Sequence, residues 1–319
     1  MMNCITDIEG INVGHSSDFS AGTGCTVVLF DRPVFGAVEL NGGGTSTRQI
    51  DSLLPHGTYG RVNAILLTGG STFGLSATDG VLQYLEERSI GLETKGGMVI
   101  PSVPSAVIYD LGIGNGKIRP DKDMGYDACL NASNKSIEEG CIGVGTGATV
   151  GKINGVDNAT KGGIATASFR FPNGIMVGVL VVVNAFGDIY SLEKNEILAG
   201  ARNKDKSGFL NTTDYIKKGY IKPYEPYSST TLCVVATNAK LNKHELIRIS
   251  KIAHTGISRV ISPVNTISDG DIVFTISIGN EDGDANSIGV AASDIISNSI
   301  VDAVLKAKGM FGISSASEL

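Results

Sequence analysis

Six short apolar runs, rich in β-branched residues, constrain the fold of this chain more than any other feature of its sequence. Runs of this length and composition predict buried strands. The predicted strands are Cys25–Phe30, Phe35–Leu40, Ala64–Thr68, Ile175–Asn184, Thr231–Thr237 and Ile272–Ile278. The most apolar stretch, residues 174–186, is also interpreted as a buried strand, because a helix needs roughly 20 residues to cross a bilayer.

Helical patterns lie between these strands. Residues 71–87 carry apolar side chains at near-helical spacing, and Asn242 with Glu245 forms a capping box ahead of a second amphipathic segment. A third helix, roughly Asn286–Lys308, is apolar on several sides, so neighbours within the domain or across a subunit interface must cover it. The 319 residues, 42% of them hydrophobic, are enough for a large core. We interpret residues 1–319 as a single α/β domain.

The composition excludes several classes of partner. A net charge of -6 and the lack of any Lys/Arg cluster predict neither nucleic acid nor membrane binding, and favour a small peptide or amide substrate. The five cysteines are odd in number and contain no C-x-x-C pair, which argues against a disulfide framework or a zinc site. The four histidines lack metal-ligand spacing, so we expect no metal and no cofactor. Residues 1–14 show no secretory signal, so we expect a cytoplasmic location.

The 42 glycines gather in clusters, which indicates tight turns around a site. One cluster, Gly143–Lys152, invites comparison with the phosphate-binding pattern G-x-x-x-x-G-K-[ST]. The spacing excludes that function, because Thr146 stands where the first glycine is required and Ile153 where a magnesium ligand is required. A purely structural turn would explain the glycines but not the lysine at the end of the cluster.

Two further patterns could carry chemistry. Asp269 and Asp271 flank a single glycine, and strand alternation would direct both carboxylates to one face. The alternative is a turn with solvated aspartates. Asn184 closes a strongly apolar strand and needs a partner if it is buried. Its alternative is a strand-end asparagine in an Asx turn.

Eight short motifs follow one another between about residues 5 and 310. They are Val13–His15, Thr23–Val28, Leu67–Leu75, Tyr109–Gly112, Gly145–Lys152, Val183–Asp188, Thr230–Thr237 and Ser268–Asp271. In this order they resemble the DmpA-type aminopeptidases (L-aminopeptidase/D-esterase), a family that includes β-peptidyl aminopeptidases and nylon-oligomer hydrolases. Several motifs in one fixed order are far more specific than any of them alone.

The resemblance implies a four-layer α/β/β/α sandwich of the N-terminal-nucleophile type, as in the ornithine acetyltransferases. It also implies a precursor that cuts itself between Ser229 and Thr230 into an α chain, 1–229, and a β chain, 230–319. Members of the family often have Asn or Gly before the nucleophile, so Ser229 is a departure from the family pattern. The cleaved units are expected to form homo-oligomers.

The resemblance also implies roles for individual residues. Thr230 would be the amino-terminal nucleophile and its free α-amine the general base, because a reference pKa of about 7.7–8.0 leaves a neutral fraction near pH 7. Lys152 would hold or polarise the hydroxyl. Asn184, with Tyr109, would donate to the oxyanion of the tetrahedral intermediate. The remaining pair, Asp269 and Asp271, would orient the lysine and the new ammonium group.

The favoured function is therefore that of an aminopeptidase that cleaves peptides, amides or esters through an acyl-enzyme on Thr230. The charged, turn-rich residues 203–229 are predicted to be a surface connection, where chain cleavage is tolerated. Two alternatives stay open. One is an acyl transferase of the ornithine acetyltransferase type, and the other is an unprocessed binding protein without enzymatic activity.

Overall fold

A large sheet forms the centre of the computed structural model, which describes residues 3–58, 60–194, 196–219 and 229–319. Its nine strands include a path in the order β10-β11-β14-β16-β2-β4-β7-β3, and β1 pairs with β2 outside this path. Their bounds are β1 (Ile11–Asp18), β2 (Thr23–Leu40), β3 (Thr47–Arg48), β4 (Arg61–Thr68), β7 (Ser105–Val107), β10 (Gly163–Arg170), β11 (Met176–Asn184), β14 (Thr230–Ala239) and β16 (Ile272–Glu281).

The remaining elements are helices and short strand pairs. The helices are α1 (Ala77–Glu86), α2 (Lys122–Leu130), α3 (Thr212–Lys217), α4 (Lys243–Ser258) and α5 (Ala285–Lys306). The short strands are β5 (Leu92–Glu93), β6 (Val99–Ile100), β8 (Thr149–Val150), β9 (Thr160–Lys161), β12 (Asp188–Tyr190), β13 (Ile197–Ala199) and β15 (Ile261–Ser262). They form three small sheets beside the large one.

The sheet folds into two layers because β2 belongs to both. The first part of this 18-residue strand pairs with β1, its last part pairs with β16, and its pairing with β4 shifts register between Leu29 and Val34. The exposed residues 31–33 lie within that shift. The sequence predicts two strands here, and the structure joins them into one.

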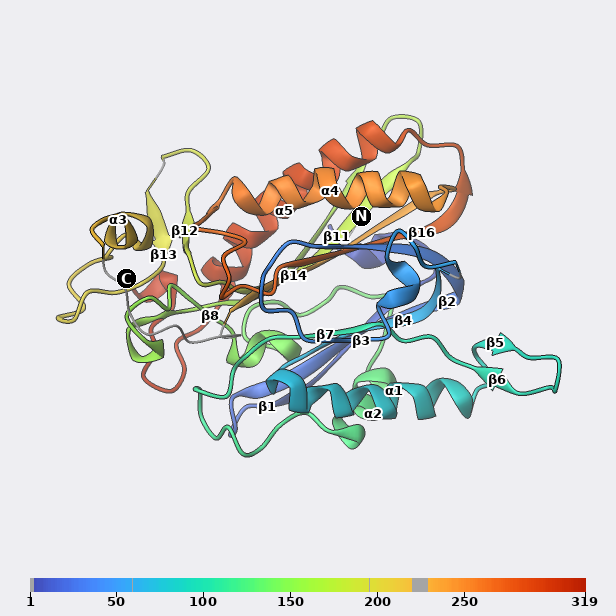
Figure 1. Ribbon diagram of the computed structural model, residues 1–319, viewed down its shortest axis with the longest axis horizontal. Coiled ribbons are helices and arrows are strands. Elements are labelled where there is room, and N and C mark those ends of the chain that lie inside the picture. The colour runs from blue at the N-terminus through green and yellow to red at the C-terminus, as the bar shows by residue number, and fades with distance from the viewer. Residues whose placement is uncertain (1–2, 59, 195, 220–228) are drawn as a thin grey trace.

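Helices α4 and α5 cover one side of the strands, and α1 and α2 cover the other (Figure 1). Three apolar layers hold these four layers of structure together. One lies between α4–α5 and the half of the sheet that contains β11 and β14, and it includes Val181 and Cys233. A second fills the space between the two halves of the sheet and includes Val234 and Phe274. A third lies under α1 and α2 and includes Leu66. This arrangement confirms the predicted α/β/β/α sandwich.

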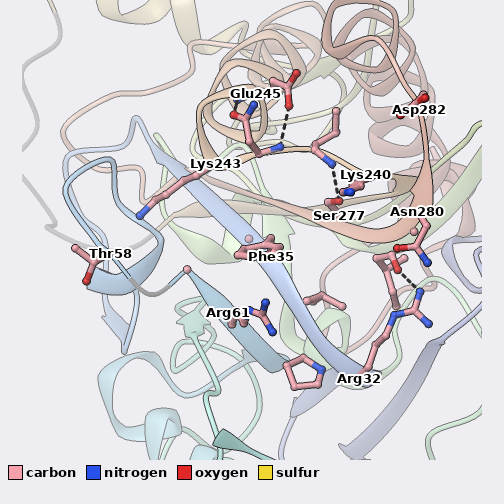
Figure 2. Close-up of a pocket in the computed structure, with 18 residues that line it drawn as sticks. Arg32, Phe35, Thr58, Arg61, Lys240, Lys243, Glu245, Ser277, Asn280 and Asp282 are labelled. Carbon is pink, nitrogen blue, oxygen red and sulfur yellow. Dashed lines mark hydrogen bonds between the residues drawn. The ribbon is translucent and has the colours of Figure 1, made fainter.

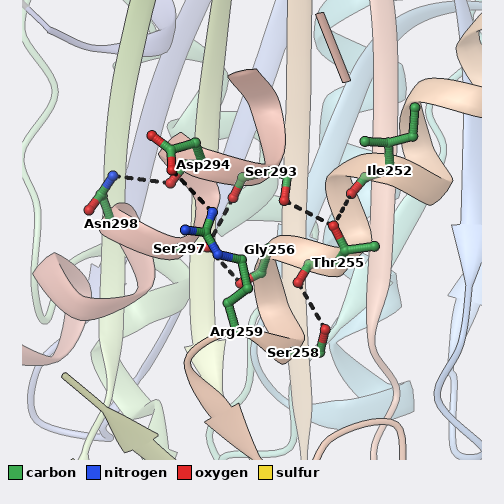
Figure 3. Close-up of polar contacts among 9 residues, drawn as sticks. All are labelled: Ile252, Thr255, Gly256, Ser258, Arg259, Ser293, Asp294, Ser297 and Asn298. Carbon is green, nitrogen blue, oxygen red and sulfur yellow. Dashed lines mark hydrogen bonds and ion pairs between the residues drawn. The ribbon is translucent and has the colours of Figure 1, made fainter. Parts of the chain in front are cut away.

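Helix α5 is long and apolar enough to cross a membrane by length and composition alone. In this structure it packs against β10, β11 and α4, and 56% of its most apolar 18-residue stretch is buried. Polar bonds tie it to α4: the Thr255 and Ser293 hydroxyls lie 3.0 Å apart, and Ser297 donates to Gly256 O over 2.9 Å (Figure 3). Gly256 permits this approach, because an ideal Cβ there would lie 2.2 Å from Ser293 O. We therefore describe α5 as a core helix.

Candidate active site

Strand pairing brings the predicted nucleophile and the predicted oxyanion donor together. Strands β11 and β14 are antiparallel neighbours, and their register places Asn184 directly opposite Thr230. Strands β14 and β16 are parallel, and a bridge just before them pairs Ser229 with Asp269. Residues distant in sequence thus meet where β11 ends and β14 and β16 begin.

The bond between Ser229 and Thr230 is buried, with exposed fractions of 0% and 4% for the two residues. The Thr230 hydroxyl donates a hydrogen bond of 2.6 Å to the carbonyl oxygen of Ser229. The prediction of a surface connection over residues 203–229 is wrong for its last residue, and residues 220–228 lie outside the described part of the chain. Burial puts this bond out of reach of a separate protease, while the hydroxyl of Thr230 is already in contact with its carbonyl group.

Lys152 reaches the same place from the glycine-rich segment. A 3₁₀ turn over Gly143–Gly147 and strand β8 precede it, and its amine donates to Asn184 O over 2.7 Å and to Asn184 Oδ1 over 2.8 Å. Thr149 N donates to the same Oδ1 over 3.0 Å. The turn therefore does more than satisfy a structural need, because it fixes the lysine against the residue that faces Thr230.

The environment of Lys152 alters its proton affinity. Burial lowers the pKa of its amine to about 7, while the negative charges of Asp269 and Asp110 oppose the shift. The charge of Lys161 lowers the pKa further. A lysine with a pKa near 7 is neutral in about half of the molecules at neutral pH, and a neutral amine can accept a proton.

Asp269 and Asp271 hold the backbone around the junction. Asp271 Oδ1 accepts a bond of 2.6 Å from Thr231 N, and Asp269 Oδ1 accepts one of 3.2 Å from Phe186 N. Burial, and next the charge of Asp269, raise the pKa of Asp271 to about 7. Both aspartates are about 1% exposed, so the alternative of solvated turn residues is wrong. Asp271 bonds Thr231, the residue after the predicted nucleophile, and the predicted contact with the Thr230 amine stays a prediction.

Tyr109 lies beside Asn184, and its backbone oxygen accepts a bond of 3.2 Å from Asn184 Nδ2. An amide nitrogen carries two protons, so this bond leaves one for an oxyanion. Tyr109 and Lys152 also line a cavity of about 170 Å³ together with Asp110, Gly112, Ile113, Thr149, Gly155 and Val156. Its small volume and its mixture of apolar and charged walls suit a short acyl group.

The sequence analysis missed Asp110 and Lys161, which are both buried near the site. Asp110 accepts bonds of 2.7 Å from Thr23 Oγ1 and from Gly70 N, and burial raises its pKa. Lys161 donates to Thr146 O and Ala148 O over 2.8 Å each, and so clamps the glycine-rich turn. The signal was present for Asp110, which stands inside the Tyr109–Gly112 motif. Nothing around Lys161 in the sequence marks it as buried.

Larger hollows lie away from Thr230. One of about 640 Å³ is lined by Arg32, Arg61, Lys240 and Lys243 among others (Figure 2). Lys240 in its wall directly follows β14 and Asn280 lies near the carboxyl end of β16, whereas the candidate site is at the amino ends of these strands. Another, of about 750 Å³, lies along α4 and α5 and is bordered by Phe169. Neither includes a predicted site residue.

Asn184→Ala tests the link between the lysine and the nucleophile. The change removes the predicted oxyanion donor, and with it the oxygen that accepts from Lys152 and Thr149. We expect the protein to fold, and its turnover to fall by about 10²–10³-fold. Turnover of an aminoacyl p-nitroanilide measures the effect. Asn298→Ala, an exposed change on α5, is the matched control and should retain full activity. Full turnover by soluble Asn184→Ala protein would contradict the assignment.

Comparisons with known proteins find relatives along nearly the whole chain. The chain matches the sequence model of peptidase family S58 over residues 3–317. An uncharacterized aminopeptidase of Mycobacterium leprae is 36% identical, over 98% of this chain and 92% of the relative. A 6-aminohexanoate-oligomer endohydrolase of Kocuria sp. is 27% identical, over 93% of this chain and 84% of the relative.

Solved structures share the fold. An L-aminopeptidase D-Ala-esterase/amidase from Ochrobactrum anthropi, described as a variant of the Ntn hydrolase fold, superposes with a TM-score of 0.74 and covers 97% of this chain and 87% of its own. A beta-aminopeptidase of Burkholderia sp. superposes with a TM-score of 0.72 and covers 99% of this chain and 91% of its own. Sequence identity is 20% in both cases. The predicted N-terminal-nucleophile type of fold is thereby confirmed.

Proposed function

The chain belongs to peptidase family S58 and is a hydrolase of the aminopeptidase type, and on that premise we propose that it activates itself by cutting between Ser229 and Thr230. The observation that carries the proposal is the contact of 2.6 Å between the Thr230 hydroxyl and the Ser229 carbonyl oxygen inside a buried junction. After the cut, Thr230 would be the amino terminus of the shorter chain and the nucleophile of the enzyme.

Self-cleavage needs a base other than the one used in turnover. Before the cut the nitrogen of Thr230 is part of a peptide bond, so it cannot accept the proton of its own hydroxyl. Lys152, with its pKa lowered to about 7 and its contact with Asn184 opposite Thr230, is the group suited to accept it. We propose that Lys152 is the base for self-cleavage.

Turnover would then use the newly freed amine. The α-amine of Thr230 takes the hydroxyl proton as the oxygen attacks the substrate carbonyl, and Asn184 with Tyr109 stabilises the oxyanion. The acyl group then resides in the cavity of about 170 Å³ beside Lys152 until water releases it. The substrates we propose are short peptides, amides or esters with a free amino-terminal residue.

A denaturing gel of the purified protein tests the processing step. We expect two chains in place of one of 33.1 kDa, with masses of about 24 kDa and about 9 kDa in proportion to their lengths. Amino-terminal sequencing of the smaller chain should read Thr-Thr-Leu-Cys. An intact chain after long incubation would remove the proposal.

The acyl-transferase alternative differs in the acceptor of the acyl group. A hydrolase releases the acyl group to water at the same rate with or without an added amino acid, whereas a transferase requires that acceptor. Membership of a peptidase family favours water as the acceptor.

We also propose that the cleaved units associate in the cytoplasm as homo-oligomers. The exposed side chains of Val290 on α5 and Phe169 on β10 support the association. Light scattering that gave the mass of one unit would exclude association.

A further inference from the structure

The peptide group between Asp269 and Gly270 holds the carbonyl of the bond to be cut. Gly270 N donates over 2.8 Å to Ser229 O, the same oxygen that the Thr230 hydroxyl contacts at 2.6 Å. We propose that this N–H stabilises the oxyanion that forms at Ser229, so that Gly270 is a catalytic residue of self-cleavage. The inference rests on the proposed cut between Ser229 and Thr230.

The glycine-rich loop at residues 41–44 holds this peptide group in place. Asp269 O, at the other end of the same peptide group, accepts a bond of 2.7 Å from Gly44 N, and Asp271 O accepts one of 3.1 Å from Asn41 N. A peptide group that is bonded at both ends is polarised, which strengthens its donor. Only glycine permits the approach, because an ideal Cβ on Gly42 would lie 2.3 Å from Asp269 O. The loop therefore orients the donor.

The absence of a side chain at Gly270 is a second requirement. An ideal Cβ there would lie 2.9 Å from Thr230 Oγ1 and 2.9 Å from Gly44 O, closer than carbon and oxygen atoms normally pack. A methyl group would thus push the nucleophile away from the carbonyl or move the peptide group that donates to it.

The proposed cut needs no reagent other than water. As Thr230 Oγ bonds to the Ser229 carbonyl carbon, the hydroxyl proton passes to the neutral Lys152 amine, and the carbonyl electron pair moves onto the oxygen that faces Gly270 N–H. Breaking of the C–N bond returns that proton to the departing nitrogen and leaves an ester on Thr230. Water then hydrolyses the ester to the Ser229 carboxylate. A substrate acyl group would form the same kind of ester, so the donor also serves turnover.

Replacing the peptide N–H at position 270 by an ester oxygen tests the donor alone. Cell-free suppression of a stop codon with glycolic acid makes this change, and conversion of the precursor is followed on a denaturing gel. We expect conversion about 10²–10³-fold slower than in the wild-type chain. The same exchange at Gly96, where an ideal Cβ would have no neighbour closer than 4.0 Å, is the control and should convert normally. Conversion of a folded ester variant at the wild-type rate would overturn the inference.

Gly270→Ala is a second, independent variant, because it crowds the donor without removing its proton. We expect slow conversion here too, with Gly96→Ala as its control, and circular dichroism verifies the fold of each variant. A folding defect in one variant leaves the other to decide. If the wild-type chain does not convert, self-cleavage itself is wrong. If it converts and a folded variant at position 270 keeps pace with it, only the role of Gly270 is wrong.

Discussion

Thr230→Ala is expected to yield an intact chain of 33.1 kDa with no measurable hydrolysis. Alanine lacks the hydroxyl that contacts the Ser229 carbonyl, so neither the cut nor the acyl-enzyme can form. Loss of a nucleophile lowers turnover by more than about 10⁴-fold in enzymes that rely on one. A denaturing gel and the turnover of an aminoacyl p-nitroanilide measure the two effects.

Two further variants are controls for Thr230→Ala. Thr231→Ala should retain cleavage and activity, because the substitution keeps the backbone nitrogen that donates to Asp271 Oδ1 over 2.6 Å. Thr230→Ser keeps a hydroxyl at the same place and should remain active. Normal cleavage in the Thr230→Ala chain would show that the cut does not depend on this residue and would disprove the mechanism.

Lys152→Met is expected to stop self-cleavage almost as completely, with conversion slowed by at least about 10³-fold. Methionine has a similar length and fills the space, but it cannot accept a proton or donate to the two oxygens of Asn184. Conversion after cell-free synthesis is measured on a gel. Lys95→Met, which changes an exposed lysine, is the control.

The pH dependence of the wild-type conversion follows from the same residue. Burial lowers the pKa of Lys152 to about 7, so the neutral form dominates above that pH and the protonated form below it. Only the neutral form is a base, and conversion should therefore slow about tenfold for each pH unit below 7. A rate that did not change between pH 8 and pH 5 would exclude Lys152 as the base.

The predicted strands of the sheet were mostly correct because their signals are local. The capping box of Asn242 and Glu245 is present at the start of α4, and Ile272 opens β16 as predicted. The missed elements lack such signals. Helix α2 is short and contains Gly125, where a side chain would lie 1.9 Å from Ala77 O of α1. This constraint is a contact between helices, and it has no trace in the local sequence.

The site residues also fall into those that the sequence predicts and those that it does not. Motif order in the sequence led to Lys152, Asn184 and Thr230, and the pairing of β11 with β14 places the last two opposite one another. The role inferred for Gly270 comes from its backbone N–H, a donor that every residue except proline carries, so the glycine in the sequence does not by itself reveal the donor. Burial also escaped prediction: the charged residues before Ser229 suggest exposure, yet the bond itself is buried where Ser229 bridges to Asp269.

The position of the proposed cut within the sheet would have a consequence for refolding. Strands β14 and β16 would belong to the shorter chain, but their neighbours β11 and β2 belong to the longer one. The two chains would therefore be interleaved, and neither would keep a complete sheet by itself. An uncut precursor can recover from unfolding as a single molecule, whereas the processed enzyme must reunite two molecules, at a rate that depends on concentration. After the proposed cut, the fold would therefore persist mainly because the two chains do not separate.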